Sequence, residues 1–273
     1  MNLPVYTTLS LTLADHVAEI RLNRPDKSNA INDAMWQEIR HACEWVDNTP
    51  EARVAIISGE GRNFCAGIDL AMLAGIQQRI AHADGARSRE ALRRLILNLQ
   101  DCLSSIERCR KPVIAAIQGA CIGGALDLVT CCDMRYATSD AVFSVKEIDI
   151  GMVADVGTLQ RLPRLIGEGW ARELAYTGRN LDAFEAEKLG LVNRIFAAHA
   201  DLENGVRQIA RAIAAKSPLA IRGTKEVLNY SRDHSIAEGL NFVATWNSTA
   251  LLSGDLKECM QAQMEKRAPQ FVD

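Results

Sequence analysis

Hydrophobic and polar residues alternate in two short stretches near the start of the chain, residues 7–12 and residues 17–22. A period of two is typical of strands that bury one face. Ala14, Asp15 and His16 lie between the two stretches, and their residue types favour a turn. The pattern therefore predicts an opening β-hairpin.

Apolar runs of strand length then alternate with stretches of helical periodicity. Asn32 is placed to cap a helix that continues to Val46. Residues 54–58 form an apolar run, and a polar loop with two glycines follows at residues 59–63. A strand, a glycine-bearing loop and a helix are expected to follow one another here.

The same unit recurs further along the chain. Apolar residues from Leu92 to Ile106 have helical spacing, Pro112 stops that helix, and residues 113–117 form a second buried run. Gly123 and Gly124 open the next helix, and short strands are expected at residues 134–137 and 142–145. Repeated units of this kind predict an α/β domain with parallel strand pairs.

The pattern changes near residue 198, beyond which only helices are expected. Their predicted ranges are residues 202–215, 218–230, 236–252 and 256–266. The division predicts a core over residues 1–198 and a helical region over residues 199–273. Its apolar residues exceed what one thin helical layer would bury, which predicts a homo-oligomer; they are Leu240, Val243, Ala244, Leu251 and Leu252.

Composition narrows the possible partners. The 273-residue chain has a net charge of −3 and a pI near 6.0, and apart from arginines 87, 89, 93 and 94 its basic residues are scattered. This argues against a nucleic-acid partner. No apolar run approaches the roughly 18 residues of a membrane span, so no membrane partner is expected.

The eight cysteines include no Cys-x-x-Cys pair, and they are interpreted as free thiols in a reducing compartment. The five histidines lack helical ligand spacing, so no metal is expected. The first residues do not form a signal peptide, and the last three are not an address of the Ser-Lys-Leu type. A cytoplasmic location is the expectation.

Three carboxylates, Asp127, Glu147 and Asp155, follow the Gly123-Gly124 pair within a largely apolar stretch. A buried carboxylate is costly unless it is paired or used. Burial and neighbouring carboxylates both raise a carboxyl pKa towards neutrality, where the group can exchange protons. The arrangement predicts an acid/base site.

Several motifs resemble the crotonase (enoyl-CoA hydratase/isomerase) superfamily over roughly residues 10–270. They are Asn23-Arg24-Pro25 with Asn29-Ala30, the run from Phe64 to Leu70, and the run from Lys111 to Ala116 with Gly123-Gly124. Residues 145–151 and 154–163 look most like the Δ3,5-Δ2,4-dienoyl-CoA isomerases. The resemblance implies a spiral of strand-strand-helix turns and a helical C-terminal trimerisation region, commonly assembled as a hexamer of two trimers.

The resemblance also implies roles for the site residues. The backbone N–H groups of Ile68 and Gly124 would form an oxyanion hole for a thioester oxygen, which suits a helix N-terminus. Glu147 would remove a proton from carbon two and Asp155 would return one at carbon six, whereas Asp127 would give electrostatic support. The plain alternatives are a tight helix entry at Gly124, a solvated loop acid at Glu147, a helix N-cap at Asp155 and a core acid at Asp127.

The coenzyme A part of the substrate would be held largely by backbone groups of two segments and of Gly124. The residues implied are Lys27, Ser28, Asn29, Ala30, Ala66, Gly67, Ile68, Asp69 and Leu70. Asp69 could at the same time cap the helix that follows it. No separate cofactor is expected, because coenzyme A belongs to the substrate.

The function that the resemblance implies is isomerisation of a 3,5-dienoyl-CoA to a 2,4-dienoyl-CoA, with fatty-acid β-oxidation as the default pathway. One alternative is an enoyl-CoA hydratase, in which Asp127 and Glu147 would activate water; the third acid, Asp155, argues against it. Another is a noncatalytic acyl-CoA-binding or RNA-associated scaffold, since one fold can host several functions.

Overall fold

The hairpin forms where the alternation predicts it. In the computed structural model, which describes residues 3–273, β1 (Leu9–Ala14) pairs antiparallel with β2 (Val17–Leu22). Asp15 and His16 connect the strands with φ angles of 50° and 63°. Two-residue hairpin turns of this kind need positive φ at both positions, and Asp and His tolerate it better than most residues.

The main sheet has six strands in the order β1-β2-β3-β4-β6-β9. After the hairpin every neighbouring pair is parallel. The added strands are β3 (Val54–Gly59), β4 (Val113–Ile117), β6 (Met134–Thr138) and β9 (Arg194–Phe196). The predicted α/β architecture with parallel pairs is therefore present.

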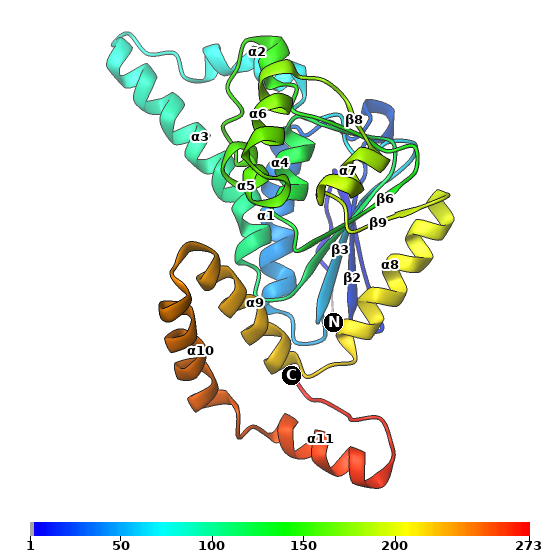
Figure 1. The fold of residues 1–273 in the computed structure, drawn as a ribbon. Helices are drawn as coiled ribbons and strands as arrows, with labels where there is room; N and C mark the ends of the chain where they lie inside the picture. The colour runs from blue at the N-terminus through cyan, green and yellow to red at the C-terminus, as the bar shows by residue number, and fades with distance from the viewer. Residues whose placement is uncertain (1–2) are drawn as a thin grey trace.

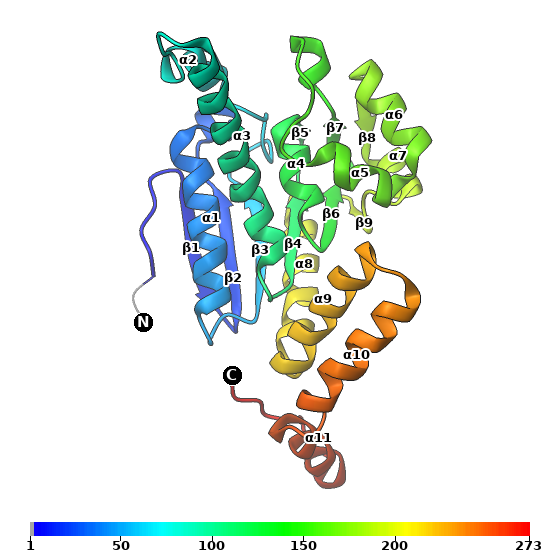
Figure 2. The same cartoon turned by 90° about the vertical axis from the view of Figure 1, so that its left-hand side faces the viewer.

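A second sheet of three short strands lies beside the first (Figure 2). β5 (Ala120–Ile122) pairs parallel with β7 (Val142–Ser144), and β7 pairs antiparallel with β8 (Leu181–Asp182). The chain alternates between the two sheets as it passes from β4 to β7. The sequence pattern did not predict β5 or β8, because two or three residues are too few to display a period.

Helices cover both faces of the main sheet (Figure 1). α1 (Asp33–Asn48) and α3 (Gly85–Arg108) contribute to one apolar cluster, and α8 (His199–Ala214) contributes to the other. Along β3, Ile57 belongs to the first cluster and Ile56 to the second. Since adjacent strand residues face opposite sides, a fully apolar strand serves both layers.

The predicted start of α1 is confirmed, because the Asn32 side chain accepts a hydrogen bond from the Met35 amide. The remaining helices connect the strands and build the upper part of the molecule in Figure 1. They are η1 (Pro25–Lys27), α2 (Leu70–Arg79), α4 (Gly124–Thr130), η2 (Glu147–Ile150), α5 (Thr158–Ile166), α6 (Glu168–Thr177) and α7 (Ala183–Leu189).

The C-terminal part is helical, as the sequence predicts. α9 (Pro218–Asp233), α10 (Ile236–Ala250) and α11 (Gly254–Glu265) extend away from the sheets (Figures 1 and 2). α8 differs from them because it packs on the main sheet through Leu202, Val206 and Ala210. The division at residue 198 stays a prediction. Within residues 3–273, no helix has the length and apolar character needed to cross a membrane.

Candidate active site

Two loops meet at the centre of the site, and glycine makes their close approach possible. Cys65 and Cys121 form an isolated parallel bridge, and the Ile122 amide donates to the Cys65 carbonyl over 3.2 Å. A Cβ atom on Gly67 would lie 2.6 Å from the Ile122 carbonyl oxygen, and the φ angle of Gly67 is +95°. Only glycine meets both conditions at this position.

The contact brings the backbone amides of Ile68 and Gly124 together. A Cβ atom on Gly124 would lie 3.6 Å from the Ile68 nitrogen. Within residues 3–273, neither amide donates a hydrogen bond to a protein group. Gly124 is the first residue of α4, where helix amides lack intrahelical partners and the potential is positive.

Neighbouring hydrogen bonds hold Ile68 in this orientation. The Ile31 amide donates to the Gly67 carbonyl over 2.8 Å, and the Asp69 amide donates to the Ile31 carbonyl over 3.0 Å. Asp69 also caps α2 by accepting from the Ala71 amide over 3.0 Å, as predicted. The two amides thus form a fixed pair of donors that no protein group within residues 3–273 occupies.

A cavity of about 420 Å³ opens in front of these amides. Its walls are mainly apolar side chains of α2 and α3, and its charged groups come from Asp127, Glu147 and Asp155. The lining residues are Trp36, Ile68, Leu73, Ile76, Gln77, Ile80, Leu92, Leu95, Ile96, Leu99, Gly124, Asp127, Glu147, Met152, Asp155 and Val156. The structure therefore brings all five predicted catalytic and oxyanion residues to one cavity.

Asp127 is completely buried in α4. Its Oδ1 accepts a hydrogen bond from the Thr158 amide over 2.6 Å, whereas Oδ2 has no partner within residues 3–273. Burial raises the pKa of this carboxyl to about 6, although the bonds from Thr158 oppose the shift. Asp127 is thus both a structural acceptor and a group that can change its charge near neutral pH.

Glu147 begins η2, directly after the second sheet delivers the chain to the cavity. Its Oε2 is buried without a partner within residues 3–273. Burial first, and then the charge of Asp127, raise the pKa of Glu147 to about 7. A Cβ atom on Gly123 would lie 3.2 Å from Glu147 Oε1, so glycine at position 123 leaves room for this carboxylate. The structure thus excludes the alternative of a solvated loop acid.

Asp155 is half-buried, and burial raises the pKa of its carboxyl. The alternative interpretation of Asp155 as a helix cap is wrong. Gly157 is the N-cap residue of α5, and the side chain that accepts from the first turn of α5 belongs to Asp127. The carboxylate of Asp155 is therefore free to face the cavity.

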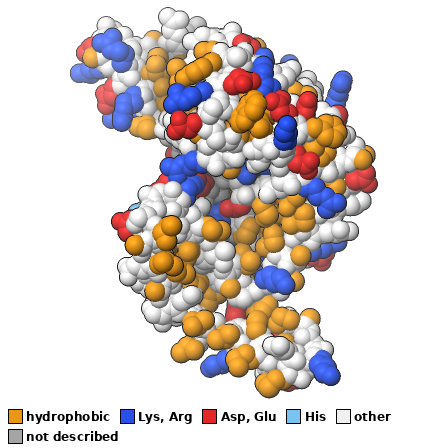
Figure 3. Space-filling view, in the orientation of Figure 1, with side chains coloured by type: hydrophobic (Ala, Val, Ile, Leu, Met, Phe, Trp, Pro, Cys, Tyr) orange, Lys and Arg blue, Asp and Glu red, His pale blue; other side chains and the backbone are white. Residues whose placement is uncertain are grey.

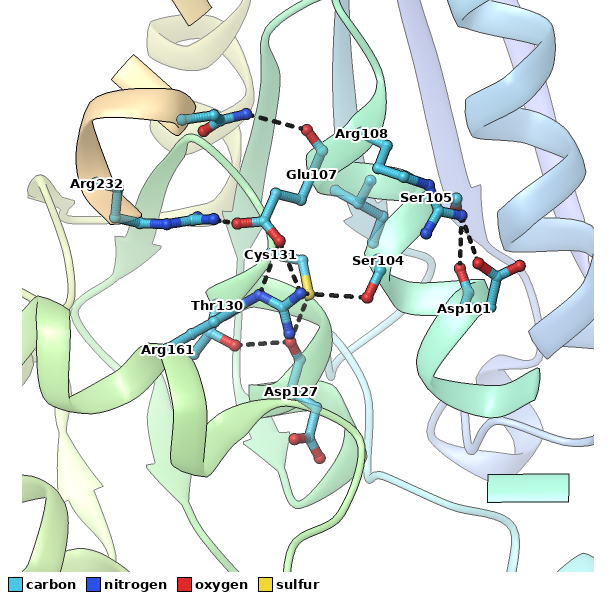
Figure 4. A network of polar contacts seen from close by, with 12 residues as sticks. Asp101, Ser104, Ser105, Glu107, Arg108, Asp127, Thr130, Cys131, Arg161 and Arg232 are labelled. Atoms are coloured by element: carbon cyan, nitrogen blue, oxygen red, sulfur yellow. Dashed lines mark hydrogen bonds and ion pairs between the residues drawn. The ribbon is translucent and has the colours of Figure 1, made fainter. Parts of the chain in front are cut away.

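An ion-pair network joins α5 to α3 and α9 (Figure 4). Arg161 of α5 donates to Glu107 of α3 over 2.7 Å and to Ser104 over 3.2 Å, and Arg232 of α9 pairs with the same glutamate. These arginines keep the pKa of Glu107 below its ordinary value despite burial. Asp127 connects with this region through its carbonyl, which accepts from the Thr130 hydroxyl over 2.8 Å.

The segments predicted to hold coenzyme A lie next to each other. The Ala66 amide donates to the Ser28 carbonyl over 2.9 Å, and Asp69 pairs with Arg24 at the same distance. Lys27 and Leu70 are exposed. Asn29 differs, because its fully buried side chain donates to the carbonyls of Glu60, Asn63 and Phe64.

Most wall residues, among them Trp36 and Met152, were not identified from the sequence as part of the site. Their only signal is apolar character, which core residues share. Among the residues that the structure describes, no group of three or more His, Cys, Asp or Glu side chains is arranged to hold a metal ion.

Residues 12–273 match the enoyl-CoA hydratase/isomerase family, and the chain belongs to this family. It is similar to the peroxisomal Δ3,5-Δ2,4-dienoyl-CoA isomerase of Arabidopsis thaliana, with 48% identity over 100% of this chain and 99% of that protein. The human mitochondrial Δ3,5-Δ2,4-dienoyl-CoA isomerase is 46% identical over 96% of this chain and 80% of its own length.

The crystal structure of an enoyl-CoA hydratase from Bacillus anthracis superimposes with a TM-score of 0.88 and 33% identity, covering 97% of this chain and 99% of that one. The predicted crotonase-like fold is therefore confirmed. The predicted cytoplasmic location is wrong, because the named isomerase relatives are peroxisomal or mitochondrial. It had been inferred from missing address signals, and such absences do not fix a location.

The raised carboxyl pKa values predict a pH-dependent stability. Asp127 and Glu147 have higher pKa values in the folded chain than when unfolded, so their contribution is complete below about pH 4 and lost as the pH rises through 7. Glu147→Gln should therefore raise the free energy of unfolding at pH 8 by about 2 kcal/mol, and the gain should vanish at pH 4. Chemical denaturation at both pH values measures this.

Glu51→Gln is the matched control for this stability measurement, because Glu51 is an exposed glutamate outside the cavity. It should change stability by less than about 0.5 kcal/mol at either pH. A Glu147→Gln variant that is no more stable than wild type at pH 8 would contradict the burial of a charged carboxylate in the cavity.

Proposed function

We propose that the protein isomerises 3,5-dienoyl-CoA thioesters to 2,4-dienoyl-CoA thioesters. The observation that carries this proposal is the meeting of three carboxylates and two free backbone amides at one apolar cavity. The relatives named dienoyl-CoA isomerase support the same function. Shifting two double bonds into conjugation with the thioester requires a proton to leave one carbon and another to arrive at a distant carbon.

In the proposed mechanism, ionised Glu147 removes a proton from carbon two. The electrons of that C–H bond move into the thioester and the diene, and the resulting dienolate oxygen accepts hydrogen bonds from the Ile68 and Gly124 amides. Protonated Asp155 then gives its proton to carbon six, which leaves the 3,5-diene as a 2,4-diene. One proton is lost and one is gained, so no redox partner is needed.

The electrostatics of the cavity suit these roles. A base with a pKa of about 7 is about half ionised at neutral pH and binds a proton well. The raised pKa of Asp155 favours the protonated form that an acid needs. Asp127 supports the site in two ways. Its side chain holds α5 by accepting a hydrogen bond from the Thr158 amide, and its charge raises the pKa of Glu147.

The hydratase alternative has support in the similarity to an enoyl-CoA hydratase. Hydration places both new bonds on adjacent carbons and needs only two carboxylates, Asp127 and Glu147. The third carboxylate, Asp155, favours the isomerase. A noncatalytic scaffold is disfavoured because buried, unpaired Asp127 Oδ2 and Glu147 Oε2 are costly in a protein that does not use them.

Coenzyme A is proposed to bind along the adjoining segments 27–30 and 66–70, with its thioester at Gly124. The hydrogen bond between Ala66 and Ser28 supports a shared surface at these segments. The exposed Lys27 and Leu70 side chains are available to the nucleotide and pantetheine parts. No separate cofactor enters the proposed reaction.

The helical C-terminal region is proposed to join copies of the chain into a trimer, or a hexamer of two trimers. Figure 3 shows hydrophobic side chains gathered on α10 and α11. In the segment from Ile236 to Glu265, large apolar side chains are exposed, with exposed fractions of 84% for Ile236, 85% for Leu252 and 77% for Met264. Light scattering should give three or six times the 29.9 kDa chain mass; a monomeric mass would contradict this proposal.

Replacing Asp155 by asparagine tests the isomerase mechanism. Asparagine keeps the shape but has no proton to give, so the isomerisation rate should fall by at least about a thousandfold, roughly 4 kcal/mol of transition-state stabilisation. Binding of a saturated acyl-CoA, measured by calorimetry, should stay close to wild type. Wild-type turnover in Asp155→Asn would contradict the assignment of Asp155 as the acid.

A further inference from the structure

The loop that carries Asp155 is held by few hydrogen bonds. It runs from Gly151 to Gly157, which have φ angles of 73° and 135°. The Met152 amide donates to the Glu147 carbonyl over 2.9 Å at its start. Within residues 3–273, no other residue donates a hydrogen bond to the Asp155 carboxylate, so the backbone must set the direction of this side chain.

One side chain bonds to the backbone of Asp155. The Nε2 group of Gln100 donates to the Asp155 carbonyl oxygen over 2.6 Å. Gln100 lies in α3, a helix of 24 residues whose neighbouring residues Leu99, Cys102 and Leu103 are buried in the core. The bond therefore ties a loop with few other hydrogen bonds to a firmly packed helix.

Ala154 and Val156, which flank Asp155, are buried in the main apolar cluster, but this packing leaves a hollow beside Gln100. A second cavity of about 430 Å³ lies there, lined in part by Gln100, Val156 and Gly157. Val156 also lines the substrate cavity, so the loop forms a thin wall between two hollows. The bond from Gln100 adds a directional restraint on the Asp155 carbonyl to the packing of its two neighbours.

We propose that Gln100 is a positioning residue that holds Asp155 at the distal carbon of the substrate, an inference that rests on the proposed isomerase function. Gln100 acts through the backbone of Asp155 and does not itself carry a proton. Glu147 and the two amides are held by other contacts, so removal of the proton from carbon two does not depend on Gln100. The residue is thus specific to the second half of the reaction.

The test replaces Gln100 by methionine, which has a similar length and helix propensity but no donor. Asp155 would then lose its fixed place, and displacement by about 1 Å can cost up to about a hundredfold in rate. We expect kcat for the conjugated product to fall by about 10- to 100-fold and KM to change less than about twofold. The Gln100→Asn variant, whose shorter side chain cannot bring its amide to the Asp155 carbonyl, should show the same changes in kcat and KM.

Gln160→Met is the matched control, because Gln160 is an exposed glutamine that lines the same second cavity. It should keep wild-type kcat and KM. Circular dichroism and melting temperature verify that all three variants fold.

Deuterium exchange separates positioning from general damage to the site. In deuterium oxide, return of the dienolate to substrate places deuterium at carbon two of the remaining 3,5-dienoyl-CoA, a step that uses Glu147 and the amides only. Gln100→Met should keep this exchange while product formation falls. Unchanged kcat in both Gln100 variants, or equal loss of exchange and product formation, would overturn the proposal. Failure of the proposed function itself would differ, since wild type would then make no 2,4-dienoyl-CoA.

Discussion

The hydrogen bond from the Thr158 amide to Asp127 joins the parts of the site that the chain supplies separately. Asp127 lies in α4, whose first residue offers the Gly124 amide, and Thr158 begins α5 directly after the loop with Asp155. Because the acceptor is a fully buried carboxylate, it also contributes charge to the cavity. One bond therefore connects the helix that begins with Gly124 to the helix that follows the Asp155 loop.

The cost of this arrangement is the burial of carboxylates near one another. Charges that lack full pairing destabilise the folded chain, and the pKa values of about 6 for Asp127 and 7 for Glu147 express that cost. Glu107, in contrast, is paired with both Arg161 and Arg232. Two buried carboxyl groups with pKa values near neutrality thus require a core that tolerates their charge.

Local pattern was sufficient for much of the fold and for the three carboxylates, whereas the oxyanion-hole and coenzyme A-binding residues came from the family resemblance. Alternation located the hairpin, Asn32 marked the start of α1, and the glycine pair marked the helix that presents the Gly124 amide. Local pattern could not predict contacts between residues far apart in the sequence. Asp127 and Thr158 are 31 positions apart, and Gln100 and Asp155 are 55 positions apart. Short strands such as β8 depend on pairing partners rather than on their own sequence.

The helix cap illustrates this limit. Asp155 lies close before α5 in sequence and has a residue type that favours capping, yet the backbone of the loop turns its side chain away from that role. The cap comes instead from Asp127, which no local rule could select. Because the Thr158 amide bonds to Asp127, the Asp155 carboxylate is not used as a cap and can face the cavity.

The most direct test of the central claim mixes the purified protein with a 3,5-dienoyl-CoA and follows ultraviolet absorbance of the conjugated 2,4-dienoyl product, with a 2-enoyl-CoA assayed in parallel for hydration. The three-carboxylate mechanism predicts rapid growth of the conjugated band and little hydration. Hydration of the 2-enoyl-CoA without formation of the conjugated diene would contradict it.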